Sequence, residues 1–226
     1  MKAILTGSTG FIGGEILNQC IAHPQITSIV ALSRRALPEP AASSSKVKVV
    51  ILQDFTNYPD SVLDELRDAD FCIWALGTYT GGAEVEAGYP LAFCEAIAKA
   101  RIGTTTKMFR MVYLSGMFVI NDQNASLWFF TTTRKAKGLA ETRLLAFSDE
   151  QKQNNQNWES YVVRPGGVLH KQTAGLNTAT YGNRLVIGVS VLAVALIETA
   201  LEGNPENKIF HGALVEKGRS ALQKAK

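Results

Sequence analysis

The sequence is poor in the residues that hold metals and disulfides. Its 226 residues include three histidines and three cysteines, Cys20, Cys72 and Cys94. An odd number of cysteines without a CxxC pair, in apolar or helical surroundings, predicts buried free thiols in a reducing compartment. Because the histidines are not clustered, the sequence does not indicate a metal site.

Long blocks of one charge are also missing. The 23 Lys and Arg residues exceed the 20 Asp and Glu residues by three, and the basic residues are scattered along the chain. This pattern does not indicate nucleic-acid binding, whereas local basic pairs suffice for a phosphate-bearing small molecule. The length and the apolar fraction of 46% are typical of one globular domain, which we expect over residues 1–226.

The one long apolar stretch, at 185–201, contains Glu198. Its length is about the minimum for spanning a bilayer, so we favour a core helix and no membrane span. Membrane association through this stretch is the alternative, which Glu198 argues against. Met1 and Lys2 precede a short apolar run that ends in a glycine turn, which is not the pattern of a signal peptide. We therefore expect a cytoplasmic protein with a small-molecule substrate, and a homodimer is left open.

Apolar strand-like runs alternate with helical patterns along the chain. Strands are expected at 2–7, 26–33, 47–52, 70–76, 107–116, 160–166 and, as a short addition, 207–212. Helices are expected at 11–23, 61–69, 91–102, 131–151 and 185–202, with a Pro/Ala/Ser-rich connector at 34–46. This alternation predicts right-handed crossovers and a doubly wound parallel α/β sheet of six or seven strands, with helices on both faces. The ligand site should lie beyond the carboxyl ends of the strands.

A glycine-rich turn, TGSTGFIG at 6–13, follows the first expected strand and opens the first helix. Gly7 permits a tight turn, Gly10 lets the backbone approach a pyrophosphate, and Gly13 lets the helix pack close to the strand. The spacing is GxxGxxG rather than GxGxxG, and the alternative is a plain glycine-rich turn. The candidate cofactor-binding residues here are Gly7, Ser8, Thr9, Gly10, Phe11, Ile12 and Gly13.

The second strand ends in Ser33, Arg34 and Arg35, with no acidic residue to meet a free ribose 2′-hydroxyl. Since a guanidinium can hold a 2′-phosphate with two hydrogen bonds, the pattern favours NADP(H) over NAD(H). The alternative is that both arginines are solvated loop charges. After the third strand, Asp54 can accept a hydrogen bond from adenine beside Phe55, or it can cap the next turn.

These motifs resemble the short-chain dehydrogenase/reductase superfamily, and in particular its small atypical members. The likeness is greatest to Tat-interacting-protein-like oxidoreductases and the fungal mitochondrial proteins related to them. It rests on TGxxGxxG at 6–13, SRR at 33–35, ALGT at 75–78, YLSG at 113–116, KGLAE at 137–141 and VVRPGGVL at 162–169. The related fungal proteins make association with mitochondria the alternative localisation.

The resemblance implies a role for each matching residue. The segment of Ala75, Leu76, Gly77 and Thr78 should line the cofactor's ribose and pyrophosphate. Ser115 should hydrogen-bond the substrate or the reacting carbonyl, and Lys137 should hold the nicotinamide ribose. The residues expected to pack against the nicotinamide are Pro165, Gly166 and Val168.

Thr133 is the departure from the family pattern, YxxxKGxxE. KGLAE fixes the register on Lys137, which puts Thr133 where the family has tyrosine. A phenol has a pKa near 10, which a neighbouring ammonium can lower, whereas an aliphatic hydroxyl is shorter and has no comparable ionisation. The candidate catalytic residues are therefore Ser115, Thr133 and Lys137, without the usual general acid. Substitute acids are Tyr79, Tyr181 and His170, each of which can equally be a packing or surface residue.

An aromatic run, LWFF at 127–130, precedes Thr133 and can wall an apolar pocket with Phe118 and Tyr181, or pack elsewhere as a loop or partner surface. We expect the substrate pocket in loops 78–90, 116–132 and 166–188.

The sequence indicates two candidate functions. One is an NADP(H)-dependent oxidoreductase, or an isomerase using the same pocket, for a small apolar carbonyl-type substrate. The other is an NADP(H)-binding sensor or regulator that has lost turnover.

Overall fold

A computed structural model describes residues 1–78, 82–170 and 185–224. Seven strands form one sheet in the order β3-β2-β1-β4-β5-β6-β9. They are β1 (Lys2–Thr6), β2 (Ser28–Ser33), β3 (Val47–Ile51), β4 (Phe71–Trp74), β5 (Phe109–Leu114), β6 (Trp158–Arg164) and β9 (Lys208–Phe210). Every pairing within this sheet is parallel, so the predicted doubly wound α/β fold is confirmed.

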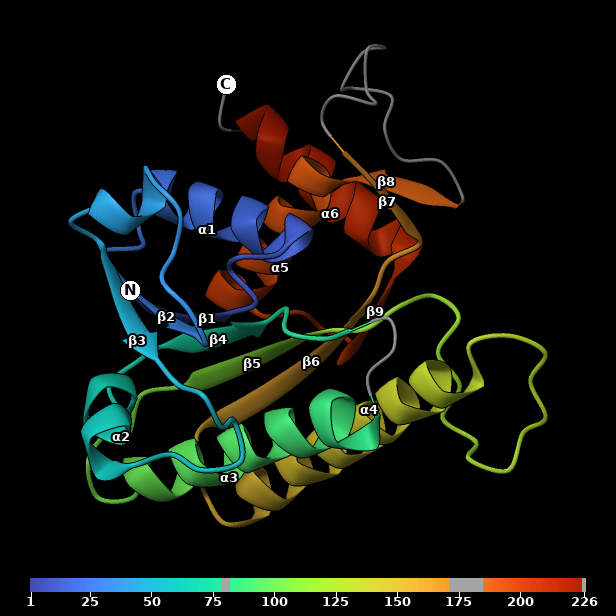
Figure 1. Cartoon of the computed structure of the whole chain (residues 1–226), viewed down its shortest axis with the longest axis horizontal. Helices are drawn as coiled ribbons and strands as arrows, with labels where there is room; N and C mark the ends of the chain where they lie inside the picture. Colours follow the sequence, from blue (N-terminus) through green and yellow to red (C-terminus); the bar gives the residue numbers. More distant parts are fainter. Residues whose placement is uncertain (79–81, 171–184, 225–226) are drawn as a thin grey trace.

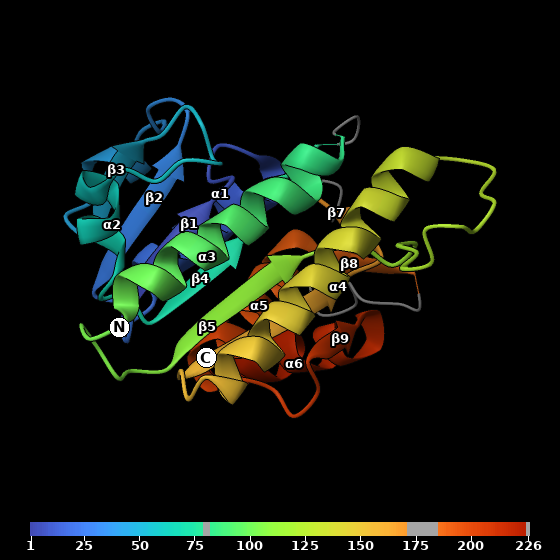
Figure 2. The same ribbon diagram turned by 90° about the horizontal axis from the view of Figure 1, so that it is seen from below.

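Helices cover both faces of the sheet (Figure 1). On one face lie α1 (Phe11–Ala22), α5 (Val189–Glu202) and α6 (His211–Lys224), and on the other α2 (Asp60–Leu66), α3 (Tyr89–Arg101) and α4 (Thr131–Gln153). Two short turns, η1 (Ala41–Ser43) and the π-helical η2 (Glu84–Gly88), lie in the connections. The chain builds outward from β1 to β3, then returns to β4 and builds the other way, as the view from below shows (Figure 2). The strand order therefore reverses between β1 and β4, where such folds bind ligands.

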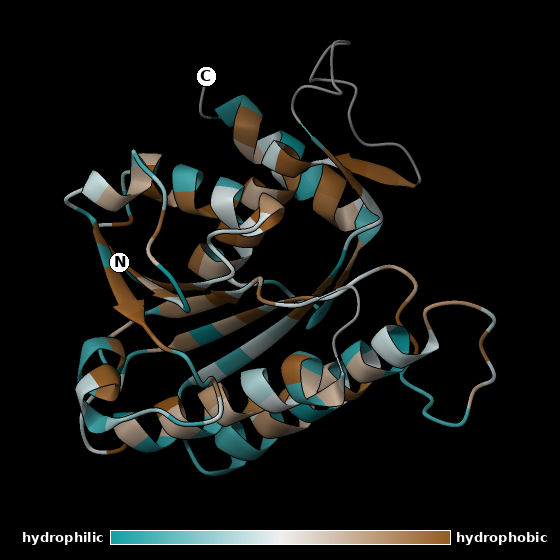
Figure 3. Ribbon diagram, in the orientation of Figure 1, coloured by the Kyte–Doolittle hydropathy of each residue, from teal (hydrophilic) through white to brown (hydrophobic). Residues whose placement is uncertain are grey.

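The sheet separates two hydrophobic cores because successive side chains of a strand point to opposite faces. Ile4 belongs to the core under α3 and α4, whereas its neighbour Leu5 belongs to the core under α1 and α5. Helices α3 and α4 carry both hydrophilic and hydrophobic residues along their length, as helices with one buried side do (Figure 3). Each fully buried large side chain contributes about 1.5–3 kcal/mol to stability.

The three cysteines are buried free thiols, as expected. Burial raises the pKa of Cys20 to about 12, and it raises the pKa of Cys72 and of Cys94 well above the usual range. The thiols therefore stay protonated and are poor nucleophiles in the folded protein.

The predicted helix at 185–202 is wrong in its first turn. Val186–Gly188 forms a short strand, β8, which pairs with β7 (Gly167–Leu169) in a separate parallel ribbon, and α5 begins only at Val189. Adjacent β-branched residues favour an extended chain, and Gly188 precedes the helix with extended backbone angles. From there on α5 is the expected core helix, with most of its residues buried. Among the described residues, no helix combines the length and the apolarity that crossing a membrane requires.

Helix α6 was not predicted from the sequence, and it packs closely on α5. A Cβ atom added to Gly218 of α6 would lie 2.2 Å from the backbone oxygen of Val191 on α5. The two helices are thus in backbone contact at this point, and any larger residue would push them apart. Gly212, on the first turn of α6, has no neighbouring atom within 4 Å of an added Cβ.

We expect Gly218→Ala to lower the free energy of unfolding by about 1–3 kcal/mol, because the added methyl group overpacks the α5–α6 contact. Gly212→Ala is the control on the same helix, and it should be neutral or stabilise by less than about 1 kcal/mol. Urea unfolding of the two variants measures both values. Equal effects would contradict the close packing of these helices.

Candidate functional site

The glycine turn after β1 is shaped by backbone contacts that exclude side chains. Gly7 has φ +71°, and a Cβ atom there would lie 2.5 Å from the carbonyl oxygen of Ala75, just beyond β4. A Cβ atom on Gly13 would lie 2.1 Å from the oxygen of Gly7. Gly10 immediately precedes α1, and its N–H donates to the Gly7 oxygen over 2.9 Å. The tight turn and the close helix approach expected from the sequence are both present.

Helix α1 presents its N-terminus at this turn without a side-chain cap. The first N–H groups of a helix lack partners within it and carry partial positive charge, which favours an anion. Ser8 is 4% exposed, and its hydroxyl has no hydrogen-bond partner among the described residues. A buried hydroxyl without a partner is costly unless a ligand satisfies it. The turn therefore has the features of an oxyanion site.

A cavity of about 440 Å³ opens beside the glycine turn. Its lining residues lie at or just beyond the carboxyl ends of four strands, and they are Gly7, Thr9, Leu32, Ser33, Arg34, Arg35, Gln53, Phe55 and Leu76. The arginine side chains are exposed. The loop around them is tied to the third strand's end, since the Gln53 amide donates to the Arg34 carbonyl over 2.8 Å. The basic pair expected to meet a 2′-phosphate thus lines the same cavity as the glycine turn.

Asp54 and Phe55 take different positions at this cavity. Asp54 Oδ1 accepts from the backbone N–H of Thr56 over 2.8 Å and from its hydroxyl over 2.6 Å, and these bonds lower the pKa of the Asp54 carboxyl. The capping role weighed in the sequence is therefore present, and Asp54 does not line the cavity. Phe55 is buried, lines the cavity and stacks on Tyr89 at a ring distance of 5.8 Å.

The segment after β4, Ala75–Thr78, is held in place by hydrogen bonds to side chains. The Leu76 N–H donates to the hydroxyl of Thr6 over 3.2 Å, which ties the ends of β4 and β1 together. Further along, the Thr78 N–H donates to Glu86 Oε1 over 2.7 Å. Gly77 lies between these two contacts, so both ends of the Ala75–Thr78 segment are held by side chains.

One side of α4 carries Thr133, Lys137 and Glu141, spaced four residues apart. Lys137 Nζ lies 2.8 Å from Oε2 of Glu86, which is fully buried. Thr133, in the first turn, is partly buried. A Cβ atom on Gly138 would lie 1.9 Å from the carbonyl oxygen of Ile120, so glycine is required for the loop to cross α4 here.

Ser115 lies in a buried network that the sequence did not predict. Its hydroxyl donates to Glu141 Oε1, which also accepts from Arg164 Nε over 2.8 Å. Arg164 donates from a second nitrogen to the other Glu141 oxygen and, over 2.7 Å, to Asn121 Oδ1. The Ser115 hydrogen is thereby committed to a carboxylate, which leaves the lone pairs of the hydroxyl for another group. Glu141 and Arg164 both lie in motifs noted in the sequence, but only distance along the fold reveals their pairing.

The residues expected near the nicotinamide form a tight crossing after β6. A Cβ atom on Gly166 would lie 2.2 Å from the Leu185 oxygen, and the Gly166 N–H donates to His211 Nδ1 over 2.9 Å. Pro165 accepts from the Met117 N–H over 2.8 Å. Val168 lies in β7. Their contact with a nicotinamide stays a prediction.

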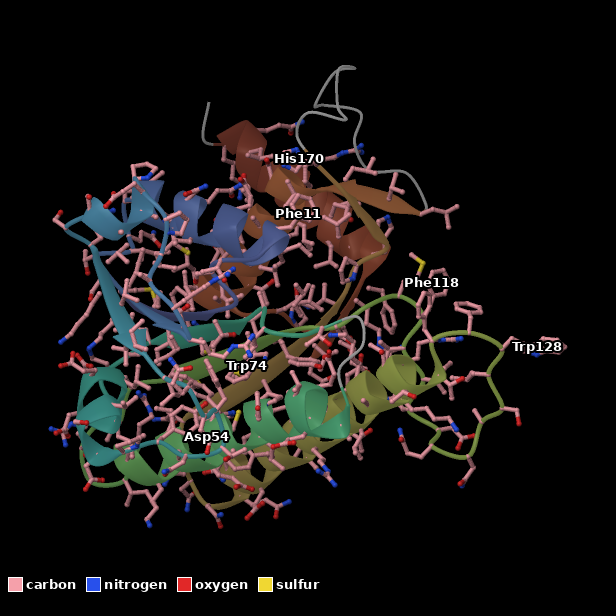
Figure 4. The ribbon with its side chains drawn as sticks, viewed as in Figure 1. Phe11, Asp54, Trp74, Phe118, Trp128 and His170 are labelled. Atoms are coloured by element: carbon pink, nitrogen blue, oxygen red, sulfur yellow. The ribbon has the colours of Figure 1, made fainter. Side chains whose placement is uncertain are left out.

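Of the substitute acids, His170 stacks on Phe11 of the glycine turn, with ring centroids 5.3 Å apart (Figure 4). Tyr79 and Tyr181 lie outside the described residues. Tyr113 is buried beside the site, and burial raises the pKa of its phenol well above the usual range. Its hydroxyl donates to the Glu86 carbonyl over 3.1 Å, so Tyr113 serves as a neutral structural donor.

The aromatic run before α4 lies on a loop that projects from the body of the protein (Figures 1 and 4). Trp128 is fully exposed, and Phe118, Phe129 and Phe130 are more than half exposed. Phe129 contacts Phe118 edge-on, and the Arg134 guanidinium lies 4.6 Å from its ring centre. These side chains do not line the cavity beside the glycine turn, and their role as a substrate wall stays a prediction.

No protein-family model matches the chain. Over 180 residues, the chain is 30% identical to "Protein FMP52, mitochondrial" of Meyerozyma guilliermondii, and this match covers 77% of the chain and 68% of that relative. The chain belongs to the FMP52 family. A shorter match, 39% over 77 residues, links this FMP52 family member to the leucinostatins biosynthesis cluster protein T of Purpureocillium lilacinum, and it spans 34% of the chain and only 28% of that protein.

Solved structures share the fold of this FMP52 family member. A short-chain dehydrogenase from Burkholderia cenocepacia, crystallised with NADP, superposes with a TM-score of 0.70 at 16% identity, over 99% of this chain and 94% of that one. The yeast methylglyoxal/isovaleraldehyde reductase Gre2, crystallised with NADPH, gives 0.64 at 14% identity, over 93% and 78%. The fold is therefore that of short-chain dehydrogenases/reductases, as the sequence motifs predicted.

We expect Glu141→Ala to lower the free energy of unfolding by about 3–5 kcal/mol, because it leaves the Arg164 guanidinium without its carboxylate partner. Ser115→Ala removes one hydrogen bond to the carboxylate and should cost about 1.5 kcal/mol. Glu150→Ala, at an exposed position of α4, should stay within about 0.5 kcal/mol of the parent. Denaturant unfolding provides the comparison. A Glu141→Ala effect no larger than that of Glu150→Ala would show that the network does not stabilise the site.

Proposed function

We propose that this FMP52 family member binds NADP(H) and acts on a small apolar carbonyl-type substrate, by hydride transfer or by cofactor-assisted isomerisation. The observation that carries the proposal is the cavity where the glycine turn meets Arg34 and Arg35. A pyrophosphate needs backbone donors and positive charge, and a 2′-phosphate needs a cation that can form two hydrogen bonds. The cavity supports the proposal because Gly7 and Thr9 of the turn line it together with both arginines.

The residues present fit such a cofactor. The uncapped N-terminus of α1 would provide donors for a pyrophosphate, and so would the Ser8 hydroxyl, which has no hydrogen-bond partner in the described part of the chain. Arg34 and Arg35 would hold the 2′-phosphate, and Phe55 offers an aromatic wall to adenine. Lys137 would hold the nicotinamide ribose. Two proteins of the same fold, the Burkholderia dehydrogenase and Gre2, were crystallised with NADP or NADPH, which supports this choice of cofactor.

The proposed substrate class is based on the cofactor and on a protein of the same fold. When bound, NADPH supplies a hydride, which carbonyl reduction requires. The name of yeast Gre2 describes it as a reductase of methylglyoxal and isovaleraldehyde, both small carbonyl compounds. In the present chain Ser115 would orient the substrate through its oxygen, since its hydrogen is committed to Glu141. Thr133 would contribute a hydroxyl without the acidity of a phenol.

The second candidate function, an NADP(H)-binding sensor or regulator, is favoured by Thr133. Helix α4 itself carries no tyrosine, and the phenol of the nearby Tyr113 is buried and donates to the Glu86 carbonyl. A positioned general acid contributes about 10²- to 10⁴-fold to rate, so its loss leaves binding intact while turnover falls. Substrate-dependent oxidation of NADPH separates the two functions.

For the localisation, the printed names of the FMP52 relatives favour the mitochondrial alternative over the cytoplasm. We propose association with mitochondria on that ground. Fluorescence microscopy of the tagged protein against a mitochondrial marker tests it, and a diffuse cytoplasmic signal would restore the first expectation.

We expect Arg34→Glu to weaken NADPH binding about ten- to a hundredfold while changing NADH binding little, because it removes a charge-assisted contact with the 2′-phosphate. Arg143→Glu reverses the same charge at an exposed position of α4 and serves as the control. Isothermal titration calorimetry with both cofactors measures the effect. Equal affinity of the parent protein for NADPH and NADH would rule out the proposed preference.

We expect Lys137→Ala to impair NADPH binding, whereas Thr133→Ala should change any turnover only slightly. The reason is that Lys137 holds ribose, while a threonine hydroxyl cannot act as the family's general acid. NADPH binding and NADPH consumption with a panel of small aldehydes and ketones are the measurements. If Thr133→Ala abolished a robust activity of the parent, the threonine would be a catalytic group in its own right.

A further inference from the structure

Glu86 is a fully buried carboxylate at the edge of the site, and no sequence motif pointed to it. It lies in the π-helical turn η2, which directly precedes α3. Single π-helical turns are rare and occur frequently at functional sites. A buried charge is costly unless it is paired and hydrogen-bonded, so the partners of Glu86 indicate what it does.

Both carboxylate oxygens of Glu86 act on parts of the site. Oε1 accepts the Thr78 N–H over 2.7 Å, and Oε2 pairs with Lys137 Nζ over 2.8 Å. A Cβ atom added to Gly77 would lie 3.1 Å from Oε2 and 3.3 Å from Nζ, so the ion pair lies directly against the Gly77 backbone. Glu86 thus connects the segment after β4 to α4.

The backbone of Glu86 is anchored as well. Its carbonyl accepts the Tyr113 hydroxyl over 3.1 Å, and the Tyr113 ring lies 5.7 Å from the Lys137 ammonium. The Lys137 side chain remains 19% exposed. The Lys137 ammonium has three donor hydrogens, and its contact with Glu86 Oε2 is an ion pair without hydrogen-bond geometry, because Oε2 has no hydrogen-bond partner among the described residues. Lys137 therefore keeps donors for a ligand on its exposed side, in a position fixed by buried groups.

We propose that Glu86 is a positioning residue, which holds the Lys137 ammonium against Gly77 and Thr78 and cancels its charge. An ammonium whose charge is compensated by a neighbouring carboxylate favours a neutral partner with several hydroxyls, such as a ribose diol, over a phosphate. The inference rests on the proposed NADP(H) site and assigns recognition of its phosphate and of its ribose to different residues. Arg34 and Arg35 recognise the phosphate, and the Glu86–Lys137 pair recognises the ribose on the nicotinamide side.

The test uses three ligands and the purified 226-residue chain. NADPH contains both ribose groups, whereas adenosine 2′,5′-bisphosphate lacks the nicotinamide half. We expect Glu86→Gln to weaken NADPH about tenfold, to weaken NADH by the same factor, and to leave adenosine 2′,5′-bisphosphate unchanged. Glu84→Gln, an exposed position of the same turn, should match the parent for all three ligands.

A merely structural Glu86 would give a different pattern. Distortion of the whole site would weaken adenosine 2′,5′-bisphosphate along with NADPH, and that result would overturn the proposal. A double-mutant cycle adds a second criterion. Because Glu86 acts through Lys137, the NADPH affinity of Glu86→Gln/Lys137→Met should equal that of Lys137→Met. Additive losses would overturn the proposal too.

The neutral double variant also serves if Glu86→Gln alone fails to fold, because it removes both charges and keeps an acceptor for the Thr78 N–H. The proposed function and this inference fail in distinguishable ways. If the parent and Glu84→Gln do not bind NADPH, the proposed function is wrong and the role of Glu86 falls with it. If both bind NADPH and Glu86→Gln binds it equally well, only the role of Glu86 is wrong.

Discussion

The contact between the Gly7 turn and the Ala75 carbonyl sets the geometry of the whole site. It joins the ends of β1 and β4, where the strand order of the sheet reverses. Because no side chain lies between them, the backbones of the Gly7 turn and of Ala75 are in direct contact. The hydrogen bond from the Leu76 N–H to the Thr6 hydroxyl also holds these two strand ends together. The cavity on one side and the Glu86–Lys137 pair on the other both depend on that alignment.

Much of this site is predictable from the sequence, because the residues depend on contacts with their neighbours along the chain. The glycine turn is predictable because its glycines meet local steric requirements. Arg34 and Arg35 are predictable because they directly follow a strand. The ion pair of Glu86 and Lys137 was beyond sequence reasoning, because 51 positions separate the partners and only the fold brings them together. Ser115 was placed correctly at its strand end, but the commitment of its hydrogen to Glu141 depends on three elements at once.

The misassigned elements have similar explanations. Helix α6 was missed because Gly212 and Gly218 reduce its apparent helix propensity, although Gly218 is what permits its close packing on α5. Val186–Gly188 was assigned to a helix because a short apolar run does not distinguish a strand from a buried helix. Tertiary contacts decide both cases, through the Val191 backbone for α6 and through β7 for β8.

The Glu86–Lys137 pair has a consequence for the redesign of this site. In a site with a tyrosine at position 133, a lysine lowers the phenol's pKa through its positive charge. Here a carboxylate 2.8 Å away already cancels much of that charge. A tyrosine introduced at position 133 alone would therefore meet a lysine whose positive charge is largely compensated by Glu86. A redesign of this site for phenol-based catalysis would therefore have to change positions 86 and 133 together.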